Sequence, residues 1–197
     1  TRGDGRLGPN NNAGVGPYGR FLESPRARHA ETAQLNAVAL TELCHLFAHH
    51  MRGHGRESYI TNVGSVASFQ GVPNFAVYAA TKAYVRVFSE ILAHELRKSG
   101  DTKISVTCLC PGGTYTEFSA SNGQQLNDAA HQFMMTSSAV VEIGLRGMFA
   151  GKLFVVPGVL NKLACLLPKL LPSGLSLLLA QSAMERSVTE TAKLVDK

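Results

Sequence analysis

Tyr78 and Lys82 stand four residues apart in the sequence, and Ser65 precedes them. On a helix, residues four apart lie on one face, one turn from each other. A phenol titrates near pH ~10, and an ammonium group within roughly 4–6 Å favours the phenolate and lowers that pKa. Tyr78 could then act as a general acid or base near neutral pH, with the Ser65 hydroxyl holding a carbonyl oxygen beside it. These residues predict a site for carbonyl reduction, although the spacing alone also fits a half-exposed helix face.

The surrounding sequence predicts the elements that would position these side chains. Residues 59–63 form a β-rich run that ends just before Ser65, and a loop rich in glycine, proline and asparagine follows. Between residues 76 and 99, apolar residues recur at three- and four-residue spacing, which predicts a helix that carries the tyrosine and lysine. A second strand is predicted at 104–110, before a Pro-Gly-Gly turn.

Three segments, in this order, resemble signatures of the short-chain dehydrogenase/reductase family. Residues 62–65 (Asn-Val-Gly-Ser) are similar to its Asn-x-Ser-Ser motif, and Tyr78 with Lys82 matches Tyr-x-x-x-Lys. Residues 111–116 (Pro-Gly-Gly-Thr-Tyr-Thr) are similar to Pro-Gly-x-x-x-Thr.

Two further positions extend the resemblance toward the N-terminus. Residues 12–14 (Asn-Ala-Gly) are similar to the family's turn after its fourth strand, and Asn36 falls where the family carries a helix asparagine. The likeness runs from about residue 9 to about residue 158. The leucine-rich tail beyond it resembles, more narrowly, the DltE-like bacterial reductases.

The resemblance implies a role for each matched residue. Tyr78 would transfer a proton at the substrate oxygen, and Ser65 would hydrogen-bond that oxygen. Lys82 would lower the Tyr78 pKa and hold the nicotinamide ribose, while Asn36 would anchor a water that leads to solvent. The cofactor would be NAD(P), which supplies the hydride. The catalytic set is then Asn36, Ser65, Tyr78 and Lys82, and the cofactor-binding set is Asn12, Ala13, Gly14, Tyr78, Lys82, Pro111, Gly112 and Thr116.

The resemblance also implies an α/β fold with a Rossmann-like, doubly wound parallel sheet. The family's Gly-rich phosphate turn, Thr-Gly-x-x-x-Gly-x-Gly, does not occur in the sequence, and the asparagine turn is reached by residue 12. Because one βαβ unit takes roughly 30 residues, we expect a sheet that is N-terminally incomplete. Residues 5–10 also lack the apolar run of a fourth strand. A fragment, a start-site error, a frameshift or a shortened gene product would each give this pattern.

Residues 14–19 (Gly-Val-Gly-Pro-Tyr-Gly) fit the dinucleotide motif G-x-G-x-x-G. That motif should follow a strand, open a helix and have an acid about 20 residues further on. Here it follows an asparagine run and contains Pro17, and no acid lies at that distance. A loop after the asparagine turn is the better interpretation.

Composition limits the classes of protein and partner. The 197 residues, with 45% hydrophobic and 17% charged content, suit a single globular domain. The net charge of +5 suggests attraction to anions, such as a dinucleotide phosphate or an acidic membrane surface. Nucleic-acid binding is disfavoured, because the basic residues are scattered and no zinc-finger or RNA-recognition motif occurs. With no signal peptide in the sequence, we expect a cytoplasmic protein.

The cysteine and histidine spacings do not favour a metal site. The cysteines lack C-x-x-C spacing, so buried free thiols in a reducing cytoplasm are expected, with Cys108 and Cys110 on one face of a strand. His45 and His49 are four apart, but without the glutamate of an H-E-x-x-H motif. We therefore expect no metal.

The C-terminal part, residues 159–197, is a leucine-rich helical extension of the partial Rossmann-like domain at 1–158. Lys162, Pro168 and Lys169 interrupt every window long enough to span a membrane. One interpretation is an apolar lid over a greasy substrate, or an interfacial anchor with the lysines at lipid headgroups. The other is a helical hairpin packed on the domain or on a partner subunit.

Two functions follow from the sequence. In the first, the chain belongs to an NAD(P)-dependent oxidoreductase acting on a small alcohol or carbonyl substrate, possibly an apolar one, as a homodimer or homotetramer. In the second, the chain is an inactive relative that binds no dinucleotide and at most pairs with a homologous subunit. The substrate, the direction of reaction and the choice between NAD and NADP are left open.

Overall fold

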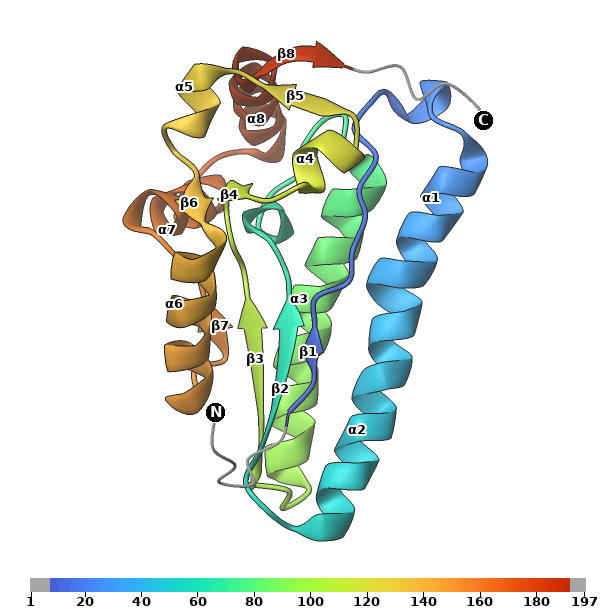
Figure 1. The fold of residues 1–197 in the computed structure, drawn as a ribbon, viewed down its shortest axis with the longest axis vertical. Helices are drawn as coiled ribbons and strands as arrows, with labels where there is room; N and C mark the ends of the chain where they lie inside the picture. The colour runs from blue at the N-terminus through green and yellow to red at the C-terminus, as the bar shows by residue number, and fades with distance from the viewer. Residues whose placement is uncertain (1–7, 192–197) are drawn as a thin grey trace.

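A computed structural model describes residues 8–191 and shows an α/β fold built on a four-stranded, all-parallel sheet (Figure 1). The strand order is β1-β2-β3-β7. β2 and β3 are paired along their whole length, from Ser58 opposite Ile104 to Val63 opposite Leu109. Each strand runs in the same direction, so all four carboxyl ends lie at one edge of the sheet. The strands are β1 (Asn10–Asn11), β2 (Ser58–Val63), β3 (Ile104–Leu109) and β7 (Phe154–Val155).

One face of the sheet is covered by two long helical segments. The first is nearly continuous in Figure 1 and consists of α1 (Arg26–Ala33), a π-helical turn η2 (Gln34–Ala39) and α2 (Leu40–His54). The second is α3 (Ala76–Lys98), which buries Val85 against the sheet. Even-numbered residues of β3, Val106 and Cys108, point to this face and join its core.

The opposite face of the sheet is covered by α6 (Ser137–Phe149). Leu109, one residue further along β3, packs here against Val140 and Val155. Neighbouring residues of a strand point to opposite faces, so helices cover both sides of the sheet. The predicted α/β, doubly wound parallel fold is therefore confirmed.

The segment between β3 and α6, together with the C-terminal hairpin, forms a cap over the carboxyl edge of the sheet (Figure 1). The hairpin consists of α7 (Val159–Leu166), a 3-10 turn η4 (Leu167–Lys169) and α8 (Ser173–Ser187). The remaining short elements are η1 (Phe21–Glu23), η3 (Val66–Ser68), β4 (Thr114–Tyr115), α4 (Phe118–Ser121), β5 (Gln124–Leu126), α5 (Asp128–His131), β6 (Met135–Thr136) and β8 (Val188–Thr191).

The predicted strands at 59–63 and 104–110 and the helix at 76–99 are present within one residue of their predicted limits. The short pairs β4–β6 and β5–β8 were not predicted, since each joins segments far apart in the sequence. The weak strand expected before the asparagine turn, at residues 5–10, lies partly outside the described residues. In the described part, the chain forms only the two-residue strand β1. None of the described helices is long and apolar enough to span a membrane.

Candidate active site

A cavity of about 920 Å³ opens at the carboxyl edge of the sheet. Of the residues predicted to form the site, those that line it are Asn12, Gly14, Ser65, Tyr78, Lys82, Pro111, Gly112 and Thr116. Asn36 and Ala13 are not among the lining residues. The structure therefore brings together residues from the ends of β1, β2 and β3 and from α3.

Tyr78 lies in the first turns of α3, between the rings of Phe75 and Phe118, at centroid distances of 5.1 and 5.4 Å. Burial raises the pKa of Tyr78, and a side-chain hydrogen bond with Ser65 lowers it in part. The sequence predicted that Lys82 would lower this pKa, but the net direction is upward. The correction has a physical reason, since the low-polarity surroundings disfavour the charged phenolate.

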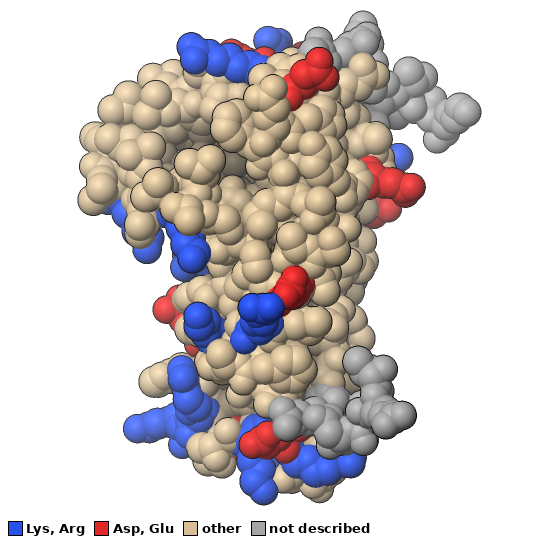
Figure 2. Space-filling model, turned by 60° about the vertical axis from the view of Figure 1, so that its left-hand side comes forward, with Lys and Arg blue, Asp and Glu red and all other residues tan. Residues whose placement is uncertain are grey.

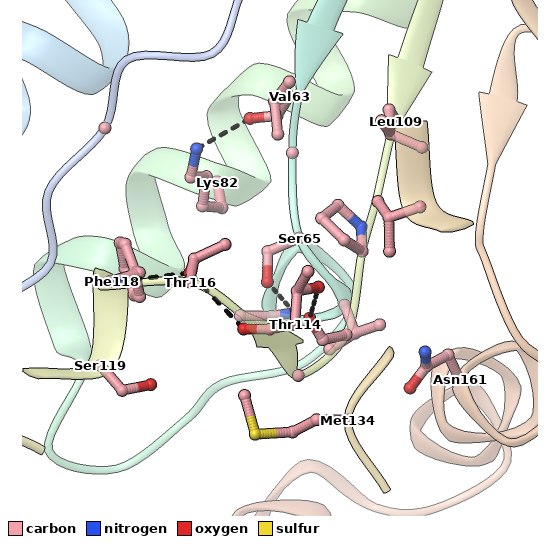
Figure 3. A pocket seen from close by; sticks show the side chains of 18 of the residues that line it. Val63, Ser65, Lys82, Leu109, Thr114, Thr116, Phe118, Ser119, Met134 and Asn161 are labelled. Atoms are coloured by element: carbon pink, nitrogen blue, oxygen red, sulfur yellow. Dashed lines mark hydrogen bonds between the residues drawn. The ribbon is translucent and has the colours of Figure 1, made fainter. Parts of the chain in front are cut away.

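Lys82 is buried at the cavity wall, with 5% of its surface exposed. Its ammonium donates a hydrogen bond to the Val63 carbonyl at 2.7 Å and lies 5.8 Å from the centroid of the Tyr78 ring (Figure 3). Burial lowers the pKa of Lys82 to about 8, while Cys108 and Cys110 act in the opposite direction. A lysine ammonium has three N–H groups, so two remain for a bound molecule.

Ser65 lies two residues after the end of β2 and is the N-cap of the η3 turn. Its Oγ accepts a hydrogen bond from the Ala67 backbone N–H at 3.1 Å, and its own N–H donates to the Ser68 Oγ at 3.1 Å. This reciprocal cap fixes the serine at the strand end, next to the phenol of Tyr78. Ser65, which follows β2, and Tyr78, on α3, therefore both line the cavity, as the sequence predicted.

Asn36 lies in the π-helical turn η2, where the helix carries an extra residue. Its amide bonds to both backbone groups of Val15, at 3.0 Å to the N–H and 2.8 Å to the carbonyl, and donates to the Thr81 Oγ1 at 3.0 Å. These bonds use both N–H groups of the side chain and one acceptor position of its oxygen. Asn36 therefore holds the loop after β1 against α3, and its predicted water stays a prediction.

The loop after β1 passes close to the catalytic helix. A Cβ on Gly14 would lie 3.2 Å from the Lys82 ammonium, and a Cβ on Gly16 would overlap the Tyr78 ring. Ala13 is exposed. The G-x-G-x-x-G match at 14–19 opens no helix, since the next α-helix begins at Arg26. Its glycines permit contact with Lys82 and Tyr78.

Two residues of the site were missed in the sequence. Asn161 of α7 lines the cavity and lies where a Cβ on Gly112 would fall, so it packs on the Pro-Gly turn (Figure 3). Asn122 accepts a hydrogen bond from the Gly16 N–H at 2.7 Å and ties that loop to α4. Asn161 could have been noticed as the one asparagine in the mainly apolar segment 159–166. No local sequence pattern indicates a role for Asn122.

All four cysteines are buried and unpaired, as expected. The Sγ atoms of Cys108 and Cys110 are 3.6 Å apart, on the strand face that was predicted. Within residues 8–191, no cluster of His, Cys, Asp and Glu is arranged to hold a metal ion.

A family model described as short chain dehydrogenase matches residues 10–127, more than half of the chain. The chain belongs to the short-chain dehydrogenase/reductase family. The matched residues include the asparagine turn, Ser65, Tyr78 and Lys82.

Individual relatives of this short-chain dehydrogenase agree with that assignment. "Probable oxidoreductase EphD" of Mycobacterium tuberculosis is 31% identical over 113 residues, 57% of this chain and 19% of that protein. An uncharacterized oxidoreductase of Myxococcus xanthus is 30% identical over 144 residues, 71% of this chain and 52% of its own. The structure of a Sphingobium yanoikuyae short-chain dehydrogenase in complex with NADPH has a TM-score of 0.69 and 31% identity, and the match covers 80% of this chain and 60% of that one.

The chain thus spans about half, or less, of the length of these curated relatives. The narrower likeness to DltE-like reductases stays a prediction.

Proposed function

We propose that this chain carries the proton-transfer centre of an NAD(P)-dependent oxidoreductase that interconverts an alcohol and a ketone or aldehyde. The observation that carries the proposal is that the Tyr78 phenol and the Ser65 hydroxyl line one large cavity, with Lys82 buried beside them. These groups can protonate a carbonyl oxygen and hold it in place.

The residues of the cavity fit the nicotinamide half of a dinucleotide. Among the described residues the Lys82 ammonium donates only to the Val63 carbonyl, so two of its N–H groups suit ribose hydroxyls, and Gly14 and Gly112 line the same cavity. The S. yanoikuyae relative was solved with NADPH, which supports the same cofactor class here. The family's Gly-rich phosphate pattern does not occur in the sequence, so we assign these residues only to the nicotinamide end.

In carbonyl reduction, Ser65 positions the substrate oxygen by donating its hydroxyl hydrogen. Tyr78 then gives its phenolic proton to that oxygen as negative charge develops on it. Burial raises the pKa of Tyr78, so the phenol carries its proton at neutral pH. Lys82 stabilises the resulting phenolate through its positive charge. The bound nicotinamide supplies the hydride.

The remainder of the cavity suits an apolar substrate. Its wall away from Tyr78 comes from the segment after β3 and from α6 and α8, and it is formed mainly by aliphatic and aromatic side chains. Those side chains are Leu126, Phe133, Met134, Val140, Val141, Leu145, Ala180, Ala183 and Met184.

The test is Tyr78→Phe in the natural protein that contains this chain, with Tyr84→Phe as the control on the same helix. We expect Tyr78→Phe to lower kcat for carbonyl reduction by about 10²–10⁴-fold, the usual size of a general-acid contribution. NADPH binding should be kept, since the phenol oxygen alone is removed. Tyr84 is exposed and bonds Thr41, so its variant should keep full activity. Retained turnover in Tyr78→Phe would refute the assigned role.

A further inference from the structure

The outer surface of the α7–α8 hairpin is unusually apolar. Its large side chains are between 43% and 80% exposed. We call this set the leucine surface: Val159, Leu160, Leu163, Leu166, Leu167, Leu170, Leu175, Leu177, Leu178 and Leu179. Large exposed apolar patches are rare on monomeric soluble proteins and mark interaction sites.

The hairpin turns its small residues inward and most of its leucines outward. Cys165, Ser176 and Ala180 are buried, and Asn161 and Ala164 face the cavity. A helix packed on a domain in water normally does the reverse, with its large apolar side chains on the buried face. This inversion indicates that something other than water covers the outer face.

The charged residues near the leucine surface indicate which kind of partner could cover it. Residues 143–184 contain four basic residues, Arg146, Lys152, Lys162 and Lys169, and no acidic residue. Arg146 pairs with Glu142, but among the described side chains no acidic group pairs with Lys162 or Lys169. Figure 2 shows a broad surface without charged residues on the upper part of the molecule, with Lys and Arg below it and both basic and acidic residues along the top of the view.

We propose that the leucine surface docks on an anionic lipid surface, with Lys162 and Lys169 at the headgroups. Apolar side chains bordered by lysines are the composition of helices that lie in the membrane interface. Each lysine near an anionic leaflet contributes about 1 kcal/mol of attraction.

A second copy of the chain is a poorer occupant of this surface. A twofold interface brings the same patch of both subunits together. With no acidic residue between 143 and 184, that stretch offers no opposite charge to Lys162 and Lys169 of the other subunit. An anionic surface supplies that charge.

Co-sedimentation with vesicles at low salt tests the proposal, with phosphatidylcholine–phosphatidylglycerol (1:1) compared with pure phosphatidylcholine. We expect binding to the mixed vesicles only. Lys162→Gln with Lys169→Gln should weaken it by roughly thirtyfold, the equivalent of about 2 kcal/mol. Arg97→Gln with Lys98→Gln removes the same charge from the end of α3 and should leave binding unchanged.

The apolar part of the contact is tested with exposed leucines. Leu160→Gln with Leu170→Gln replaces side chains that are 64% and 80% exposed, and should weaken binding at least tenfold. Leu22→Gln with Leu46→Gln is the matched control, at 92% and 64% exposure on other elements, and should bind normally. Circular dichroism should show the same fold in both.

Absence of co-sedimentation at low salt would overturn the proposal. So would equal weakening by the control leucine pair, which would indicate non-specific adsorption. If Leu160→Gln with Leu170→Gln instead converted a dimer into a monomer without vesicles, the surface would belong to a second copy. We expect the wild type to bind the mixed vesicles. Binding should be weakened in the lysine pair and in the leucine pair of α7–α8, and both control pairs should keep it.

Discussion

At the scale of single residues, the site depends on a phenol and an amine whose pKa values shift in opposite directions. Burial raises the pKa of Tyr78 and lowers that of Lys82 to about 8. In the proposed reaction the protonated tyrosine is the donor, and the lysine is the group that changes charge above neutral pH. Ser65 moderates the first shift through its hydrogen bond.

The Lys82 pKa predicts the alkaline limit of carbonyl reduction. Below about pH 8 the ammonium is charged and stabilises the developing phenolate; above it the amine is neutral and this stabilisation is lost. We expect kcat/KM to be level at neutral pH and to fall above about pH 8. In Lys82→Arg, the guanidinium stays charged and the fall should move to higher pH. If kcat/KM of a folded Lys82→Arg variant fell at the same pH as that of the wild type, the role of this lysine would be contradicted.

At the scale of elements, the strand ends and the helix α3 could be predicted because their signals are local. The three- and four-residue spacing of apolar side chains and the Pro-Gly turn each lie within one segment. The pairs β4–β6 and β5–β8 could not be predicted, since each strand has only two to four residues and its partner is distant in sequence. The π-helical turn at Asn36 also has no periodic signal.

Packing of α6 on the sheet depends on two glycines. A Cβ on Gly147 would overlap the Val155 side chain, and a Cβ on Gly144 would lie 2.9 Å from Leu109. Gly147→Ala should therefore lower the free energy of unfolding by about 1–3 kcal/mol, the usual effect of overpacking.

Gly53→Ala in α2 is the matched control, because a Cβ there meets nothing within 4 Å. Alanine is the better helix former, so this variant should be neutral or more stable by up to about 1 kcal/mol. Urea denaturation measures both. Equal stability of Gly147→Ala and the wild type would mean that α6 can shift away from β7.

At the scale of the whole molecule, the question is whether this chain binds a dinucleotide. We expect NADPH at about tenfold above its Kd to stabilise the chain by about 1.4 kcal/mol, which for a chain of this size raises Tm by roughly 3–6 °C. Lys82→Gln should reduce the rise, since the shorter and uncharged amide replaces the ammonium that faces the cavity. Lys98→Gln, an exposed lysine of the same helix, should not.

No rise in Tm with NADPH would favour the second function, an inactive relative that binds no dinucleotide. It would leave the vesicle-binding surface unaffected, because the leucine surface lies on the outer face of α7–α8. The two proposals can therefore fail independently.

The sequence by itself determined the family, the parallel sheet and most of the site. Ser65, Tyr78 and Lys82 are placed by a strand end and one turn of a helix, which short-range spacing specifies. The tertiary structure decided the direction of the Tyr78 pKa, the place of Asn161 at the cavity and the outward direction of the leucines. These depend on burial by segments far apart in the chain, such as Gly16 and Phe118 around Tyr78. Long-range burial leaves no periodic trace in the sequence, so only the folded chain shows it.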